Sequence, residues 1–257
     1  GLIDGHAHLD REGLKDVFPS LANCRSIEDI LGRIEELVKD AEPGAWIVTM
    51  PIGMPPYYFD VPGCLKEGRL PTRWEIDQVA PENPVYIRPI WGFWRHTLPL
   101  DSVANSMALE LAGIGPGMSP PPETVEFETD TGRGELNGII HEWAFMPIVE
   151  LAYFHMMPGF THGDRTAGLE HAMRAYNSFG TTSVYEEHGC AQELIDAYRA
   201  AHKAGRMTVR ASLVYSPSWL TIGNADFQPT MDSWAVEIGG AGDGDEWLRV
   251  EGLYLDF

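Results

Sequence analysis

Two histidines near the start of the chain have the spacing of a metal-ligand pair. His6 and His8 are one residue apart in the segment GLIDGHAHLD, and the preceding Leu2 and Ile3 are apolar, which indicates a strand. Side chains two positions apart on an extended chain leave the same face, so both imidazoles are expected to converge. Neutral imidazole nitrogen is a good ligand for zinc and related divalent ions. The pattern fits a metal site, and it also fits two polar residues that hydrogen-bond backbone groups at a strand end.

A second group of possible ligands lies in the segment FGTTSVYEEHGC, which ends at Cys190. Glu186 and Glu187 are adjacent, so on a strand they point to opposite faces and one of them should face inward. Carboxylate oxygen is a competent ligand for zinc, manganese or iron. The alternative is an ordinary solvated glutamate pair after a strand. His188 and Cys190 are interpreted as loop residues without a ligand role.

The elements that would position these residues follow from hydrophobic period and turn signals. From residue 163 onward, helices and strands alternate regularly. Strands are expected at 181–187, 207–215 and 247–257, and helices at 163–180, 191–205 and about 229–239. This alternation predicts parallel βα units whose strands are buried on both faces. With the strand before His6, four parallel strands are expected, which fits half of an eight-stranded barrel as well as a doubly wound sheet.

Residues of about 11–162 are expected to form a long insertion after the first strand. An amphipathic helix is predicted at 26–44, with Ser26 as its N-cap and Pro43-Gly44 as its stop. The remaining expected elements are strands at 45–52 and 84–91, a long ordered loop at 51–83, a helix at 103–115 and a hairpin at 124–142.

Composition and charge exclude several classes of partner. The chain has 257 residues, of which 44% are hydrophobic and 11% aromatic, as expected for a globular protein. The net charge of -20 disfavours binding to nucleic acid or to an anionic membrane surface. No apolar run is long enough to span a membrane. The three cysteines are far apart and no signal-peptide pattern opens the chain, so a reducing cytoplasm is the expected location.

Five segments, in order along the chain, resemble the amidohydrolase superfamily in the branch called amidohydrolase family 3. They are GLIDGHAHL, PTRWEIDQVAPENPVYI, NSMALELAGIG, GELNGIIHE and FGTTSVYE. The resemblance implies an α/β fold, the first half of a TIM-like (β/α)8 barrel, as one partial barrel domain over 1–257. It implies that His6 and His8 bind the catalytic metal, and the register counted from Gly180 favours Glu186 as a further ligand. The family's remaining ligands and its general base would lie beyond Phe257, so the C-terminal half of the barrel is expected as a second chain or a missing segment.

The sequence departs from the family pattern at the group that bridges two metals. Many relatives carry a carboxylated lysine on the fourth strand, and alignment through Asp256 puts Gly252 in its place. Other relatives bridge with a carboxylate on the fourth strand or with a cysteine at the end of the second. Glu186 is the favoured replacement here, and Glu251 on the fourth strand is the alternative.

The resemblance implies a metal-dependent hydrolase of an amide, N-acyl, carbamate or related C–N bond, acting through a metal-activated water. Zinc is the first choice of metal, with manganese or iron as alternatives and one or two ions bound. The substrate is expected to be a small molecule. The aromatic runs PPYYF and IWGFW favour an aromatic or apolar group on it, or they only pack the insertion, and His96 is a candidate pocket residue. The alternative function is a truncated or degenerate barrel that serves as a scaffold or binding protein.

Overall fold

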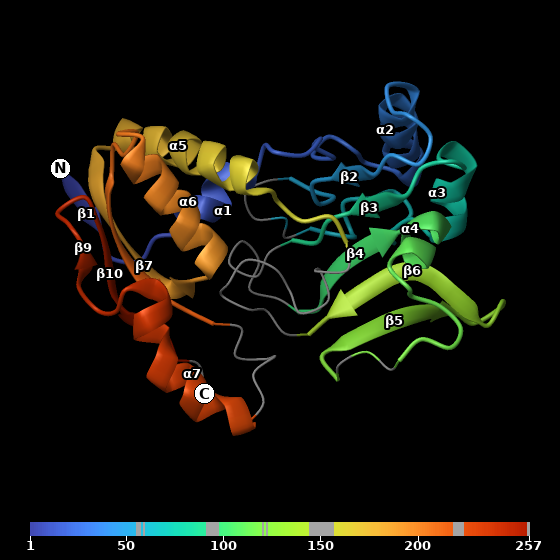
Figure 1. Cartoon of the computed structure of the whole chain (residues 1–257). Coiled ribbons are helices and arrows are strands. Elements are labelled where there is room, and N and C mark those ends of the chain that lie inside the picture. Colours follow the sequence, from blue (N-terminus) through green and yellow to red (C-terminus); the bar gives the residue numbers. More distant parts are fainter. Residues whose placement is uncertain are drawn as a thin grey trace. The chain divides into compact units, whose positions relative to one another are not determined.

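A computed structural model of the chain describes residues 1–54, 58, 60–90, 98–119, 121, 123–143, 157–217 and 224–255 (Figure 1). The side chains of Asp10, Glu187, His188 and Asn224 are outside this description. The chain divides into two compact units. The terminal unit is built mainly from Gly1–Val17 and Phe160–Phe257, and the inserted unit mainly from Phe18–Phe145.

The terminal unit contains four parallel strands in one sheet, as the sequence predicted. They are β1 (Leu2–Asp4), β7 (Thr181–Cys190), β8 (Arg210–Tyr215) and β10 (Leu248–Leu253), and the short β9 (Asp243–Gly244) pairs antiparallel with β10. The order across the sheet is β1-β7-β8-β10-β9. A doubly wound sheet needs a point where the strand order reverses. The described strands instead advance in one direction, so the doubly wound alternative does not fit them.

Helices pack against one face of this sheet (Figure 1). They include α5 (His162–Ser178) and α6 (Gln192–Lys203). The short helix α1 (Leu9–Leu14) packs on α5. A further helix, α7 (Asn224–Ile238), follows β8 in the chain. Apolar side chains from the helices and from alternate strand positions form the core of the unit, including Leu9, Leu169, Val184, Leu194, Leu213 and Val250. At the α5–β7 junction, Gly180 has a φ of +84°, and its N–H donates to the Asn177 carbonyl. This left-handed turn ends α5 and directs the chain into β7.

The expectation that the parallel strands would be buried on both faces is wrong for β10 and β1. In β10, Leu248 and Val250 are buried while Arg249 and Glu251 are exposed. Ile3 of β1 is 78% exposed. The reason is that the helices of the terminal unit cover one face of the strands, so β10 alternates between buried apolar and exposed positions. In β8, by contrast, the consecutive residues Leu213, Val214 and Tyr215 are all buried.

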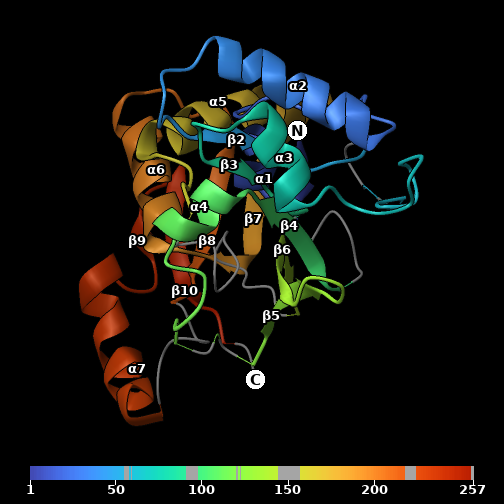
Figure 2. The same cartoon turned by 90° about the vertical axis from the view of Figure 1, so that its right-hand side faces the viewer.

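The inserted unit has its own mixed sheet and its own hydrophobic core. Its strands are β2 (Ile47–Thr49), β3 (Val85–Ile87), β4 (Leu100–Ala104), β5 (Val125–Asp130) and β6 (Glu135–Glu142), in the order β2-β3-β4-β6-β5. Its helices are α2 (Ile27–Lys39), α3 (Arg73–Val79) and α4 (Ser106–Leu111), which face the viewer in Figure 2. Buried residues of these helices, such as Ile30, Ile76 and Leu109, pack with Val85 and Ile87 of the sheet.

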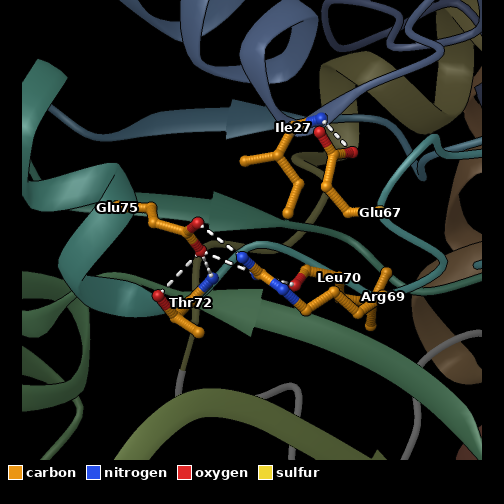
Figure 3. Close-up of polar contacts among 6 residues, drawn as sticks. All are labelled: Ile27, Glu67, Arg69, Leu70, Thr72 and Glu75. Atoms are coloured by element: carbon orange, nitrogen blue, oxygen red, sulfur yellow. Dashed lines mark hydrogen bonds and ion pairs between the residues drawn. The ribbon is translucent and has the colours of Figure 1, made fainter.

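Three short elements differ from the sequence expectations. The helix α3 lies inside the expected loop at 51–83, β4 reaches into the start of the expected helix at 103–115, and α1 follows the histidine pair without having been expected. Helix α3 is fixed locally by a capping box, in which Thr72 and Glu75 satisfy each other's backbone N–H groups. Figure 3 shows Glu75 at this helix start, with the guanidinium of Arg69 donating to both carboxylate oxygens at 2.8 and 2.9 Å.

The helices of the described residues are too short or too polar to cross a lipid bilayer.

Candidate metal site

The segment that carries His6 and His8 is held against β7 by backbone hydrogen bonds. In β1, Asp4 pairs with Val184, and one residue later the chain turns. The Asp4 side chain accepts from the His6 backbone N–H at 3.0 Å, which fixes this turn. The Ala7 N–H then donates to the Tyr185 carbonyl at 2.9 Å. The segment therefore lies beside the middle of β7, directly after the carboxyl end of β1.

The imidazoles of His6 and His8 lie close together, as the spacing predicted. Their ring centroids are 5.1 Å apart and the ring planes are 81° apart. Ala7 between them is buried, while His6 is exposed and His8 is half-buried. Two imidazoles that share one tetrahedral zinc ion have ring centroids about 5 Å apart, given nitrogen–zinc distances of about 2 Å. The two side chains thus fit a shared divalent metal in donor type and in separation.

The described residues provide these two imidazoles and no complete ligand set. Within the described part of the chain, no group of three or more His, Cys, Asp or Glu side chains could hold a metal ion. Zinc sites in proteins use three or four protein ligands. Further donors are therefore needed to complete a site at His6 and His8.

Glu186 lies next to the histidine segment, but its carboxylate faces the helices. The side chain is 3% exposed and shares its face of β7 with the core residue Val184. Its Oε1 atom accepts from the Leu9 backbone N–H at 2.9 Å and from the Tyr198 hydroxyl of α6 at 2.6 Å. The expectation that Glu186 faces inward, into the interior of a barrel, is wrong, because alternation along β7 places residues 184 and 186 on the helix-covered face. Ligation of the metal by Glu186 stays a prediction.

A second tyrosine, Tyr176 of α5, belongs to the same polar group. Burial raises the pKa of Tyr176 to about 12, and the negative charges of Glu186 and Asp4 act in the same direction. A backbone hydrogen bond with His8 acts in the opposite direction. Tyr176 therefore stays protonated at neutral pH. No sequence signal pointed to Tyr176 or Tyr198, because each is a single aromatic residue on an ordinary helix.

The other residues that the sequence analysis singled out lie as follows. Glu251 of β10 is exposed on the face opposite to Val250, and it accepts from the Ser212 hydroxyl at 3.2 Å. Cys190 is 1% exposed within the core of the terminal unit, and it belongs to β7, which extends three residues beyond the expected strand at 181–187. The side chains of Glu187 and His188, the residues His96 and Asp256, and most of the two aromatic runs lie outside the described residues.

The inserted unit contains a separate polar cluster around His141 of β6. Its Nδ1 lies 2.7 Å from Asp101 and its Nε2 lies 3.1 Å from Glu128. The hydrogen bond with Asp101 raises the pKa of His141, burial lowers it, and Glu128 raises it further. The imidazole thereby joins β6 to β4 and β5. No sequence pattern predicted this cluster, since its three residues come from three strands.

The chain is similar to known proteins in its sequence and in its fold. The model of the amidohydrolase family matches residues 1–255. An N-substituted formamide deformylase of Arthrobacter pascens is 29% identical over 216 residues, which are 80% of this chain and 35% of that protein. An uncharacterized metal-dependent hydrolase of Pyrococcus horikoshii OT3 superposes with a TM-score of 0.59 at 19% identity, over 98% of this chain and 41% of that chain. A second such hydrolase, from Pyrococcus furiosus, gives a TM-score of 0.57 at 20% identity, over 98% of this chain and 42% of that chain. The chain therefore spans between a third and a half of the length of these proteins.

Proposed function

Because the chain belongs to the amidohydrolase family, we propose that it supplies His6 and His8 as metal ligands to a metal-dependent hydrolase. The observation that carries the proposal is the pair of imidazoles, 5.1 Å apart, at the carboxyl end of a parallel strand. Catalytic groups in barrels of parallel strands gather at that end. Zinc is the proposed metal, with manganese or iron as alternatives and one or two ions bound.

The proposed reaction is hydrolysis of an amide, N-acyl, carbamate or related C–N bond in a small molecule. The similarity to an N-substituted formamide deformylase supports this bond type. A divalent metal at the site would polarise the carbonyl oxygen as a Lewis acid and would activate water for attack on the carbonyl carbon. The residues of this chain hold that ion and fix its position. Asp4 fixes the turn before His6, and the buried Ala7 keeps the two imidazoles on the side of the segment away from the core.

We propose further that other strands pair with β1 and complete a barrel that brings the remaining ligands. Strand β1 forms one edge of the sheet, and its Leu2 and Ile3 are 63% and 78% exposed. An exposed apolar edge strand is a surface that another strand pairs with. The one-directional order of the parallel strands is the order of consecutive strands in a barrel. The second half of such a barrel would be supplied by further residues of the same protein or by a second chain.

Metal binding by the full-length protein tests this function. The metal-free protein is titrated with Zn²⁺, and a variant with His6→Ala and His8→Ala is compared with the matched control His171→Ala. His171 is a half-exposed histidine of α5 that pairs with Asp16 and is not part of the proposed site. The double variant should bind Zn²⁺ at least about 100-fold more weakly, whereas the control should bind as the wild type does. Equal binding by all three proteins would contradict the metal assignment and favour the scaffold alternative.

A further inference from the structure

Glu186 is a carboxylate buried in an apolar core. It is 3% exposed, and it lies on the face of β7 that carries the core residue Val184. Burial of a carboxylate is costly unless hydrogen bonds compensate for the lost hydration. Two donors meet Oε1, the Leu9 N–H at 2.9 Å and the Tyr198 hydroxyl at 2.6 Å. The two hydrogen bonds of this buried carboxylate, next to a proposed metal ligand, therefore need a physical explanation.

The first of these contacts fixes the start of α1. Leu9 is the first residue of this helix, and His8 is its N-cap residue, with a φ of -142° and no side-chain capping hydrogen bond. The first N–H groups of a helix have no partner within the helix. Glu186 provides an acceptor for one of them from a strand 177 residues away in sequence. The capping function is thereby carried out by Glu186, and the imidazole of His8 is not used for it.

The contacts of β7 lie on both sides of His8. The Ala7 N–H donates to the Tyr185 carbonyl at 2.9 Å, and the Leu9 N–H donates to the Glu186 carboxylate. These bonds link the residues before and after His8 to consecutive residues of one strand. The Tyr198 hydroxyl holds the carboxylate in turn from α6. The backbone of His8 is therefore fixed on both sides, and its side chain leaves the backbone from a defined position.

We infer that Glu186 is a positioning residue for His8, acting through the Leu9 N–H. The inference rests on the proposed function, since His8 is a proposed metal ligand. Groups that orient a metal ligand typically contribute about 10–100-fold to metal affinity. This role differs from ligation by Glu186 itself, because it needs an acceptor oxygen at the Leu9 N–H and not a negative charge at the metal.

Three variants of the full-length protein separate these roles, with Co²⁺ as the probe. Glu186→Gln keeps an oxygen that accepts from Leu9 and Tyr198, whereas Glu186→Ala removes it. A positioning role predicts that Glu186→Ala weakens Co²⁺ binding by about 10–100-fold and that Glu186→Gln stays within about threefold of the wild type. Val184→Ala is the matched control, because Val184 lies on the same face of β7 and its apolar side chain belongs to the core. It should lower the melting temperature and leave Co²⁺ affinity within about twofold.

Two outcomes would overturn the inference. One is a Glu186→Gln variant that loses as much Co²⁺ affinity as Glu186→Ala, which would make Glu186 a ligand. The other is a Glu186→Ala variant that binds Co²⁺ as Val184→Ala does, which would make its role purely structural. The visible absorption of bound Co²⁺ gives a second readout, because a displaced His8 changes the ligand geometry, and Glu186→Gln should restore the wild-type spectrum.

A failure of the proposed function can be distinguished from a failure of the positioning role of Glu186. If the variant with both histidines replaced binds Co²⁺ as tightly as the wild type, the metal assignment fails. The NMR signals of the His8 imidazole in the metal-free protein then decide the positioning role. A shift of these signals in Glu186→Ala, absent in Glu186→Gln and Val184→Ala, supports it, and unchanged signals in Glu186→Ala overturn it.

Discussion

At the scale of single residues, the spacing of the two histidines predicted their convergence but not the direction of Glu186. Two side chains on one short extended segment must leave the same side, so His6 and His8 could be placed from the sequence. For Glu186, alternation along β7 separates two faces but does not say which one the helices cover. The hydrogen bonds to Leu9 and Tyr198 join three separate parts of the chain, and only the fold brings them together.

Glu75 at the start of α3 provides a residue-scale prediction for acid stability. The hydrogen bond from Arg69 lowers the pKa of Glu75 from 4.5 to about 2, with further hydrogen bonds from Thr72. Since the folded-state pKa is depressed, the charged form stabilises the fold fully above pH 4.5, and this contribution disappears as the pH falls toward 2. Solvent screening limits the contribution to about 1 kcal/mol.

The variant Glu75→Gln should therefore melt at a lower temperature than the wild type at pH 7. The two melting temperatures should approach each other as the pH falls from 4.5 toward 2. Thermal unfolding followed by circular dichroism across this range measures the difference. Glu36→Gln, which removes an exposed pair with Arg33, is the control and should show almost no pH-dependent difference. A constant gap between Glu75→Gln and the wild type at all pH values would contradict the assigned pKa.

At the scale of secondary-structure elements, length decided what could be predicted. The helix α2 and the helices α5 and α6 are long enough for their period or end signals to be read from the sequence. The helices α1 and α3 have six and seven residues, so the period is hardly repeated. The capping box of α3 was visible as Thr72 and Glu75, yet it stands in a segment rich in proline and glycine. The packing of the elements against one another could not be predicted either, because a local sequence pattern does not specify contacts between distant segments.

The contact between α1 and α5 depends on glycines and gives an element-scale prediction. A Cβ atom added at Gly13 of α1 would lie 1.8 Å from the Gly168 carbonyl oxygen of α5. Backbone atoms cannot move aside as a flexible side chain does, so Gly13→Ala should force the two helices apart. We expect a loss of about 1–3 kcal/mol in the free energy of unfolding, measured by denaturant titration.

The same variant should also weaken metal binding, because α1 begins directly after His8. The control is Gly32→Ala in α2, where an added Cβ meets nothing within 4 Å. Removing a glycine from an exposed helix interior should stabilise the protein by about 0.5–1 kcal/mol. Wild-type stability of Gly13→Ala would show that the close packing of α1 on α5 is not required.

At the scale of the whole molecule, the regular βα alternation made the four parallel strands predictable. What the sequence could not provide was how completely those strands would be covered. Burial on both faces was expected from apolar composition, whereas helices cover one face of the described strands. The coverage of a strand depends on all the elements that pack around it, so composition along one strand does not determine it.

The exposed edge at β1 predicts the behaviour of residues 1–257 when they are expressed alone. Leu2 and Ile3, which are 63% and 78% exposed, should promote strand pairing between copies, so residues 1–257 alone should self-associate and melt over a broad range. The double variant Leu2→Lys with Ile3→Lys should reduce the association measured by sedimentation velocity, because charges oppose edge-to-edge pairing. Leu111→Lys, a 62% exposed position on α4, is the control and should not. A monomeric wild-type chain of residues 1–257 with a sharp thermal transition would contradict the proposed completion by further strands.

The hydrogen bond between Leu9 and Glu186 also has a consequence for the order of events during synthesis. Its partners are 177 residues apart, so Leu9 leaves the ribosome long before its acceptor exists. At about 5–20 residues per second, the delay is roughly 10–35 s. The inserted unit is translated in that interval and has its own core, so it can fold first. The histidine pair would then be among the last parts of the described chain to take its final position, and premature loading with metal would be disfavoured until β7 is in place.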